Sequence, residues 1–251
     1  MKEIIAIINQ KGGVGKSTTA LALGAGLINR GYSVLFIDLD AQGNLTHTLG
    51  IQSTNLTSVD LLAKRMSIKE VLQDTKKGTV IPASPTLAGA DTVITDVGKE
   101  YRLKEALSDV LNDYDYAVID TPPALGVLTI NALTACSSIV IPAQADIYSL
   151  QGIHQLHQTI STVKQYCNSG LKVKGILLTR YNTRSILSRD LTEIIEQTAQ
   201  KLDTKLFTST IREAIAIKES QVHQQDIYTY APKSNVALDY ENFVEEFLRR
   251  N

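Results

Sequence analysis

A short glycine-rich stretch near the N-terminus carries the residue types that phosphate chemistry needs. Lys16 and Ser17 complete the Gly-Lys-Ser end of a phosphate-binding loop, where the ammonium group neutralises β- and γ-phosphate charge and the hydroxyl ligates Mg²⁺. Gln10 stands where that pattern has its first glycine, and Lys11 follows it. The loop is therefore either a damaged nucleotide site or a variant in which the second lysine has a task of its own.

The segments around this loop have the context that a phosphate site requires. The apolar run Ile4–Ile8 predicts a buried strand, and Ser17–Arg30 predicts a helix. Between them, Gly12, Gly13 and Gly15 allow successive backbone N–H groups to turn toward phosphate oxygens, and the helix directs its positive dipole end to the same place. Spacing and context favour a functional loop over a glycine-rich turn with chance lysines.

Two later segments end predicted strands with carboxylates. F-I-D-L-D-A-Q-G-N, Phe36–Asn44, holds Asp38 and Asp40. Y-A-V-I-D-T-P-P, Tyr116–Pro123, holds Asp120. Carboxylate oxygens are ligands that Mg²⁺ prefers. Taken singly, each aspartate would more often be a turn or helix-capping residue, so its meaning depends on the other segments.

The lysine-rich loop K-G-G-V-G-K-S-T, Lys11–Thr18, resembles the deviant Walker A loop of the ParA/MinD family of ATPases, and the aspartate segments resemble that family's switch and Walker B segments. The resemblance implies that Lys11 crosses the interface of an ATP-sandwich dimer and contacts phosphates bound by the other subunit. Such a cation would stabilise transition-state charge and join two subunits around ATP. Asp40 is expected near Mg²⁺ and the attacking water, Asp38 is expected to carry less of the chemistry, and Asp120 is expected to hold Mg²⁺ through water.

The resemblance assigns a full set of site residues. The expected catalytic residues are Lys11, Lys16, Asp40 and Asp120, and the expected Mg²⁺ ligands are Ser17, Asp40 and Asp120. The expected contacts to the phosphates of ATP are Lys11, Gly12, Gly13, Val14, Gly15, Lys16, Ser17 and Thr18. Leu178–Asn182 and Ile211–Ser220 resemble the segments that hold the base, through backbone or side chains of Arg180, Tyr181, Ile211 and Arg212.

Short apolar runs and helix-like segments alternate along the rest of the chain. The continuous runs, which suit strands buried on both faces of a parallel sheet, are Val34–Ile37, Ala117–Ile119, Ile139–Ile141 and Ile176–Leu178, with edge pieces near Val80 and Leu206. Helices are expected at Arg102–Leu111, Leu128–Ala135, Leu150–Tyr166, Ser188–Lys201 and Asn235–Arg250. We predict an α/β fold, a doubly wound and mainly parallel sheet of about seven strands with helices on both faces, as a single P-loop ATPase domain over residues 1–251. Gly24 and Gly26 are expected to let the first helix pack closely on the sheet.

Length, charge and cysteine content narrow the classes of protein. The chain has 251 residues and a formal net charge of -1, so any binding to nucleic acid must depend on a local basic patch. Cys136 and Cys167 lack metal-ligand spacing and indicate free thiols in a reducing cytoplasm. No stretch approaches the roughly 20 apolar residues that cross a membrane, and the N-terminal run enters the glycine-rich loop too soon for a signal peptide. We expect a cytoplasmic protein.

Segments outside the loop resemble the ParA/Soj partition branch of the family more than its cell-division branch. These segments are Ile81–Ala88, Ile139–Gly152 and Tyr230–Tyr240. The branch implies a homodimer with ATP, binding of that dimer to non-specific double-stranded DNA, association with the nucleoid, and slow basal hydrolysis that a ParB-type centromere-binding protein stimulates. Because the first strand begins almost at Met1, we expect no N-terminal DNA-reading extension.

Segregated charge points to a surface for DNA. Between Asp146 and Asp190 the sequence has no acidic residue. Cations doubled by a two-fold axis could track phosphates, with an affinity that falls as salt rises. The expected DNA contacts are Lys172, Lys174, Arg184, Arg189, Arg212 and Lys218. The alternative is a solvated surface whose counter-charges lie elsewhere in space.

Three other functions fit parts of the pattern. A MinD-like membrane-cycling ATPase needs a basic amphipathic helix at the C-terminus. The last predicted helix carries three glutamates, so Phe243 and Phe247 are expected in the core, and no stable membrane association is expected. An iron–sulfur carrier of the superfamily needs a paired-cysteine motif that the two cysteines do not match. A scaffold that binds ATP without hydrolysing it is not favoured, because the aspartates are all present.

Overall fold

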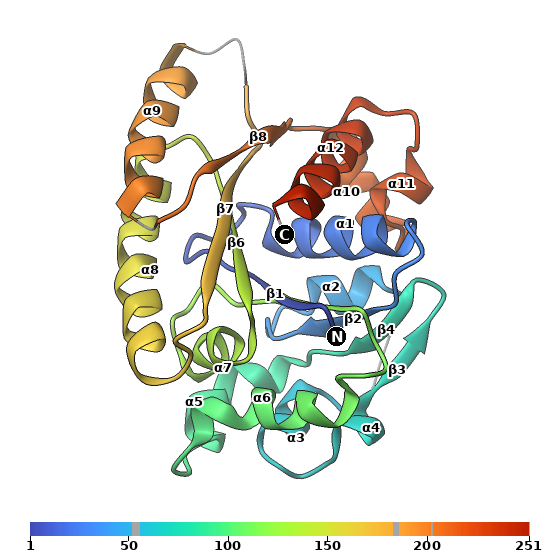
Figure 1. Ribbon diagram of the computed structural model, residues 1–251. Helices are drawn as coiled ribbons and strands as arrows, with labels where there is room; N and C mark the ends of the chain where they lie inside the picture. The colour runs from blue at the N-terminus through green and yellow to red at the C-terminus, as the bar shows by residue number, and fades with distance from the viewer. Residues whose placement is uncertain (52–55, 183–185, 202, 251) are drawn as a thin grey trace.

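One mixed sheet forms the centre of the computed structural model, which describes residues 1–51, 56–182, 186–201 and 203–250 (Figure 1). Its described strands lie in the order β3-β4-β2-β5-β1-β6-β7-β8. β3 and β4 are antiparallel, and all other neighbours are parallel. The strands are β1 (Glu3–Ile7), β2 (Val34–Asp38), β3 (Gln73–Thr75), β4 (Gly78–Ile81), β5 (Tyr116–Asp120), β6 (Ser138–Ala143), β7 (Lys172–Thr179) and β8 (Leu206–Ile211).

Seven of these strands correspond to the predicted runs, and β3 is an addition. It pairs with β4 across a turn in which Gly78 has a φ of 119°, a conformation that favours glycine. Its three residues are polar and none is buried, so they carry no apolar pattern from which a strand could be predicted.

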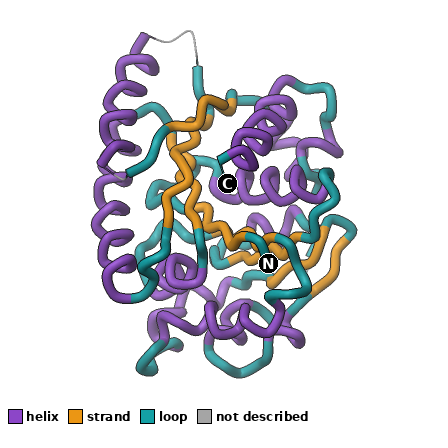
Figure 2. The backbone as a smooth tube through the Cα atoms, viewed as in Figure 1, coloured by secondary structure: helices purple, strands orange, loops and turns teal. Residues whose placement is uncertain are grey.

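Helices occupy most of the segments between strands (Figure 2). In the described ranges they are α1 (Lys16–Ile28), α2 (Asn44–Thr48), α3 (Ser58–Leu62), α4 (Ile68–Val71), α5 (Ala90–Val93), α6 (Arg102–Leu107), α7 (Val127–Ala135), α8 (Ile147–Tyr166), α9 (Ile186–Lys201), α10 (Ile215–Val222), α11 (Ile227–Tyr230) and α12 (Asn235–Arg249), with 3₁₀ turns at Pro85–Gly89, Lys99–Tyr101 and Ser108–Val110. The short helices α2 to α5, α10 and α11 were not predicted. Within these ranges, no helix has the length and apolar character to cross a membrane.

The helices form a layer on each face of the sheet, as predicted. α1, α2 and α10 to α12 cover one face, and α3 to α9 cover the other (Figure 1). Alternate residues of β1 serve the two cores, because successive side chains of a strand point to opposite faces. Ile5 and Ile7 pack with the α1 layer, and Ala6 and Ile8 pack with the α7 layer. The doubly wound α/β prediction is confirmed.

The glycines of α1 permit close approach, but to two different elements. A Cβ atom on Gly24 would lie 2.1 Å from the ring of Phe36 on β2, as the prediction of packing on the sheet requires. A Cβ atom on Gly26 would lie 2.8 Å from the side chain of Val244, so this glycine allows α12, and not the sheet, to approach.

Strand order brings the motif-bearing segments together. β1 is flanked by β5, and β2 lies on the far side of β5, with Ile7 level with Asp120 and Asp120 level with Asp38. The loops that follow these three strands therefore leave one edge of the sheet side by side. In open α/β sheets ligands bind outside this carboxyl edge.

Candidate nucleotide-binding site

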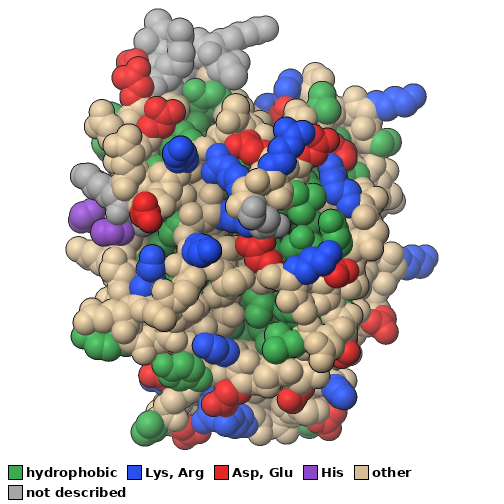
Figure 3. Space-filling model, viewed as in Figure 1, with side chains coloured by type: hydrophobic (Ala, Val, Ile, Leu, Met, Phe, Trp, Pro, Cys, Tyr) green, Lys and Arg blue, Asp and Glu red, His purple; other side chains and the backbone are tan. Residues whose placement is uncertain are grey.

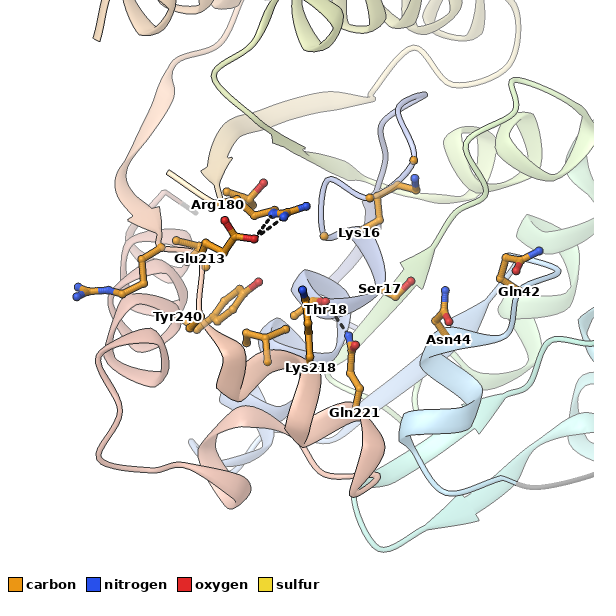
Figure 4. A pocket seen from close by; sticks show the side chains of 18 of the residues that line it. Lys16, Ser17, Thr18, Gln42, Asn44, Arg180, Glu213, Lys218, Gln221 and Tyr240 are labelled. Carbon is orange, nitrogen blue, oxygen red and sulfur yellow. Dashed lines mark hydrogen bonds and ion pairs between the residues drawn. The ribbon is translucent and has the colours of Figure 1, made fainter. Parts of the chain in front are cut away.

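A cavity of about 500 Å³ opens at the carboxyl edge, over the start of α1 (Figure 4). The loop between β1 and α1 forms one wall, with Gly13 and Gly15 at φ values of 77° and 85°, which favour glycine. The residues that line the cavity are Gly12, Gly13, Gly15, Lys16, Ser17, Thr18, Asp40, Gln42, Asn44, Pro123, Thr179, Arg180, Ile211, Arg212, Glu213, Ala214, Ile217, Lys218, Gln221 and Tyr240. Backbone N–H groups at a helix start make such a wall an anion site.

Lys16 lies in the cavity wall with its ammonium group turned back on the loop. Its Nζ donates to the carbonyl oxygen of Lys11 at 3.2 Å, and the residue is 7% exposed. Burial lowers the pKa of Lys16, and the charges of Asp120 and Asp40 oppose that shift. Two carboxylates therefore favour the cation that a phosphate ligand needs.

Asp120 is fully buried beneath the cavity, at the end of β5. Among the described residues, neither of its carboxylate oxygens has a hydrogen-bond partner at normal geometry. Burial and the charge of Asp38 raise the pKa of Asp120 well above its usual range, while the Ser17 hydroxyl and the Lys16 ammonium lower it. A buried carboxylate without a hydrogen bond is costly unless a ligand or ordered water satisfies it.

The oxygen atoms near Asp120 fit Mg²⁺. Ser17, Asp40 and Asp120 together offer a hydroxyl and two carboxylates, which are hard donors. No group of three acidic, histidine or cysteine side chains with metal-binding geometry occurs in the part of the chain that the structure describes. Mg²⁺ is usually held by one or two carboxylates together with substrate phosphates and water, which Asp40, Asp120 and the Ser17 hydroxyl could complement.

The two aspartates after β2 have different surroundings. Asp40 lines the cavity and is 9% exposed, and its Oδ1 accepts from the backbone N–H of Gln42 at 3.0 Å. Asp38 is fully buried and accepts from Asp40 N at 3.1 Å, Thr46 N at 2.9 Å and Thr46 Oγ1 at 2.7 Å. Burial raises the pKa of Asp38 to about 6. Asp38 therefore ties α2 to the strand end, which agrees with its smaller expected share of the chemistry.

The side chain of Lys11 is not among those that line the cavity. Its ammonium group forms an ion pair with Asp146 and donates to Gln144 Oε1 at 3.1 Å. Its backbone N–H donates to Asn9 Oδ1 at 2.9 Å, and Asn9 in turn donates to the carbonyl of Pro142 at 2.7 Å. One loop thus carries a lysine inside the cavity and a lysine outside it.

Of the expected base contacts, three line the cavity and one does not. Arg180, Ile211 and Arg212 lie in its wall. Tyr181 does not: its backbone N–H donates to Ile211 O, and its hydroxyl accepts from Thr192. Its side chain therefore does not line the cavity, and a contact of Tyr181 with the base would have to come from the loop backbone, as the prediction allows. Val14 also stays out of the cavity, fully buried, with its carbonyl accepting from Thr179 Oγ1 at 2.8 Å.

Several lining residues were not predicted. Tyr240, Gln221 and Glu213 point toward the cavity from α12, α10 and the loop after β8, and Glu213 pairs with Arg180 (Figure 4). Gln42 and Asn44 lie within the predicted switch segment, so their proximity to Asp40 in the sequence could have identified them as site residues. Glu213 lies within the predicted base-holding segment Ile211–Ser220, whereas Gln221 and Tyr240 lie outside both predicted base-holding segments.

The expected DNA contacts do not form one surface. Lys172 and Lys174 lie at the start of β7, whereas the nucleotide cavity lies at its end, roughly 20 Å away at about 3.3 Å per residue. The Lys174 side chain is only 9% exposed; it pairs with Glu3 at 3.0 Å and lies over the Phe247 ring, so its assignment to DNA is wrong.

The remaining candidates divide between cavity and surface. Arg212 pairs with Asp239 at 2.6 Å, and Lys218 points into the nucleotide cavity (Figure 4). Lys172 is exposed. Arg184 and the side chain of Arg189 lie outside the described residues.

The fold and this site define a class of protein, the P-loop ATPases, with ATP and Mg²⁺ as cofactors. Residues 2–173 match the family model described as an AAA domain. Over 251 residues the chain is 39% identical to the sporulation initiation inhibitor protein Soj of Bacillus subtilis, covering 98% of each chain. It is 36% identical to the chromosome-partitioning ATPase Soj of Treponema pallidum, covering 100% of this chain and 99% of the relative.

A solved structure with bound ATP analogue and magnesium has the same fold. It is that of cobyrinic acid a,c-diamide synthase from Mycobacterium smegmatis, with a TM-score of 0.86 and 34% identity, covering 99% of this chain and 95% of that one. The full-length Soj relatives identify the family. The chain belongs to the ParA/Soj family of P-loop partition ATPases.

Proposed function

We propose that the chain binds ATP and Mg²⁺ in the cavity at the start of α1, closes there into an ATP-sandwich homodimer, and binds non-specific double-stranded DNA in that form. The observation that carries the proposal is the placement of the two loop lysines. Lys16 lies in the wall of its own nucleotide cavity, and the ammonium group of Lys11 lies outside it. A cation outside the cavity supports a contact made to a second subunit.

The roles within one subunit follow from burial and charge. The backbone of the loop cradles the phosphates, and Lys16 leaves the Lys11 carbonyl to neutralise them. Ser17 would ligate Mg²⁺ directly, and Asp120, buried beneath, would hold it through water. Asp40 positions or activates the attacking water from the cavity wall.

The switch segment would couple hydrolysis to release. Asp40 is followed by a turn at Gly43 and by α2, which Asp38 anchors through Thr46. Loss of the γ-phosphate removes the contact that orders Asp40, so the dimer loosens and leaves DNA. Slow basal turnover keeps the DNA-bound state long-lived, and a ParB-type centromere-binding protein accelerates it. The protein would thus be cytoplasmic and associated with the nucleoid.

Binding to DNA would depend on separate exposed lysine and arginine side chains and not on one continuous basic patch. Lysine and arginine side chains are interspersed with acidic ones across the face shown in Figure 3. Lys172 at the amino end of β7 and Lys218 at the carboxyl edge are exposed. Charge reversal at Lys172 tests the amino edge directly, whereas reversal at Lys218, which lines the nucleotide cavity, tests the carboxyl edge only if ATP binding is measured in parallel and is unchanged.

A DNA-retardation assay with ATP, ADP and a nonhydrolysable ATP analogue, at two salt concentrations, tests this function. We expect retardation with ATP and the analogue, little with ADP, and weaker retardation at higher salt for every DNA sequence. The Lys16→Ala variant is the negative control. Equal retardation with ADP, or none at low salt with the analogue, would contradict the proposal.

The MinD-like alternative has less support. The two phenylalanines of α12, Phe243 and Phe247, are both 0% exposed, as predicted, and so are not available to insert into a lipid surface. Flotation with anionic liposomes and ATP is the corresponding test. Recovery of the protein in the lipid fraction would favour membrane cycling over DNA partition.

A further inference from the structure

The ion pair between Lys11 and Asp146 joins the phosphate loop to the connection between β6 and α8. Gln144 strengthens the junction, because its Oε1 accepts from Lys11 Nζ at 3.1 Å and its Nε2 donates to Gly13 O at 3.3 Å. The Lys11 and Asp146 side chains are 27% and 30% exposed, so the pair is only partly screened by water. Lys11 is thus held within its own subunit.

The two oxygens of Asp146 have separate partners. Oδ1 accepts from the backbone N–H of Ser149 at 2.9 Å and so caps α8, whereas Oδ2 accepts from the Lys11 ammonium. Burial would raise the pKa of Asp146, but the hydrogen bonds from Lys11 and Ser149 and the charge of Lys11 outweigh it and hold that pKa below its usual value. Asparagine at this position would keep the cap and lose the charge.

The holding site lies next to the nucleotide cavity. Gln144 and Asp146 line a cleft of about 280 Å³, and Arg180 and Glu213 line both this cleft and the nucleotide cavity. The Arg180–Glu213 ion pair is common to the walls of both spaces. Lys11 is therefore stored beside the edge at which a second subunit would present its phosphates.

We propose that Asp146 is a positioning residue that stores Lys11 in its own subunit and sets the ATP concentration at which the dimer closes. The inference rests on the proposed role of Lys11 in the partner's site. To reach the phosphate oxygens bound by the other subunit, Lys11 must give up its contacts with Asp146 and Gln144. The free energy lost with this ion pair offsets part of the free energy gained from the new contact. Removing the charge of Asp146 lowers this cost in both subunits.

Sedimentation of the full chain across a titration with a nonhydrolysable ATP analogue measures the threshold, which is the analogue concentration at which half of the protein is dimeric. Asp146→Asn should lower the analogue concentration for half dimerisation by about fivefold, as expected for one partly screened ion pair. Asp146→Glu keeps the charge and should resemble the unchanged protein. Asp96→Asn, which removes an exposed carboxylate from its ion pair with Arg102, is the matched control and should also leave the analogue concentration for half dimerisation unchanged.

Binding of ADP to the monomer provides a readout that a merely structural effect would disturb. It should be the same in the unchanged protein and in Asp146→Asn. If that variant does not fold, Asp146→Ser, which also retains a capping oxygen, takes its place. An unchanged or raised threshold in the variant that folds would overturn the role of Asp146. Normal dimerisation of Lys11→Ala would instead overturn the proposed trans contact itself, so the two failures are distinguishable.

Discussion

The ammonium group of Lys16 donates a hydrogen bond to the backbone carbonyl of Lys11 at 3.2 Å, while the ammonium group of Lys11 is paired with Asp146, 135 residues further along the chain. The two lysines of one loop therefore serve two places. Lys16 lines the nucleotide cavity of its own subunit. The Lys11 side chain lies outside that cavity. This separation leads to different predictions for the two residues.

Lys16→Ala should weaken ATP binding by about 100-fold, because it removes charge-assisted hydrogen bonds to phosphate, each worth about 1.5–3 kcal/mol. Titration of the monomer with a fluorescent ATP analogue measures the loss. Lys11→Ala is the matched control from the same loop and should bind the analogue normally while failing to dimerise. Equal loss of binding in both variants would show that Lys11 also contacts the nucleotide of its own subunit.

Asp40→Ala should reduce ATP hydrolysis by about 100-fold or more, the scale of a positioned general base, and should leave ATP-dependent dimerisation intact. The reason is that Asp40 lies in the cavity wall, whereas the loop and Lys16 provide the phosphate contacts. Phosphate release at saturating ATP, with sedimentation in parallel, separates the two effects. Turnover at the unchanged rate would remove Asp40 from the chemistry.

Gly24→Ala should destabilise the fold even though alanine favours a helix by about 1 kcal/mol over glycine. The added Cβ would lie 2.1 Å from the ring of Phe36, which is fully buried, and overpacking of this kind costs about 1–3 kcal/mol. The free energy of unfolding in urea measures the balance. A more stable variant would mean that Phe36 moves aside without cost.

Glu246→Gln should lower the free energy of unfolding by about 2 kcal/mol near neutral pH. The Glu246 carboxylate on α12 accepts from the backbone N–H groups of Thr208 and Ser209, each at 2.8 Å, and so satisfies two donors of the edge strand β8. An amide in its place turns one NH₂ group toward these donors.

The effect of Glu246 should also depend on pH. Burial raises the pKa of Glu246, but hydrogen bonds from Thr208, Ser209 and Arg250 outweigh it, so the folded-state pKa lies below the usual value. The carboxylate therefore stabilises the fold above about pH 4.3, the ordinary glutamate pKa, and this contribution is lost as pH falls through the lower folded value. The difference between the two proteins in urea should shrink on acidification. A difference that stays constant down to pH 3 would contradict this account.

The nucleotide site shows how far a sequence pattern reaches. The loop from Lys11 to Thr18, Asp40 just after β2 and Asp120 at the end of β5 belong to short segments whose conformation depends on neighbouring residues. The strand order then brings these segments together. The wall opposite the loop was not predictable in the same way. Tyr240 and Gln221 reach the cavity only because α10 and α12 pack beside α1, through contacts between residues about 200 positions apart.

The predicted DNA contacts show that a count of charges along the sequence does not locate a basic patch on the surface. Lys172 and Lys174 stand two residues apart in an acid-free stretch, yet one is exposed and the other is enclosed by Glu3 and the Phe247 ring. The carboxylate that neutralises Lys174 is that of Glu3 on β1, 171 residues earlier in the sequence. A local excess of charge therefore did not predict a surface patch.

The sequence by itself determined that this chain forms a mainly parallel α/β sheet with a phosphate loop after its first strand, because backbone periodicity and glycine spacing are local properties. Only the tertiary structure decided which way each loop lysine is directed. The Gly-Lys-Ser pattern marks Lys16 as the phosphate lysine, but no local pattern shows which residue the Lys11 side chain pairs with. The fold brings Asp146, which follows β6, beside Lys11, and Asp120, at the end of β5, beside Lys16. Both contacts arise because β6 and β5 flank β1.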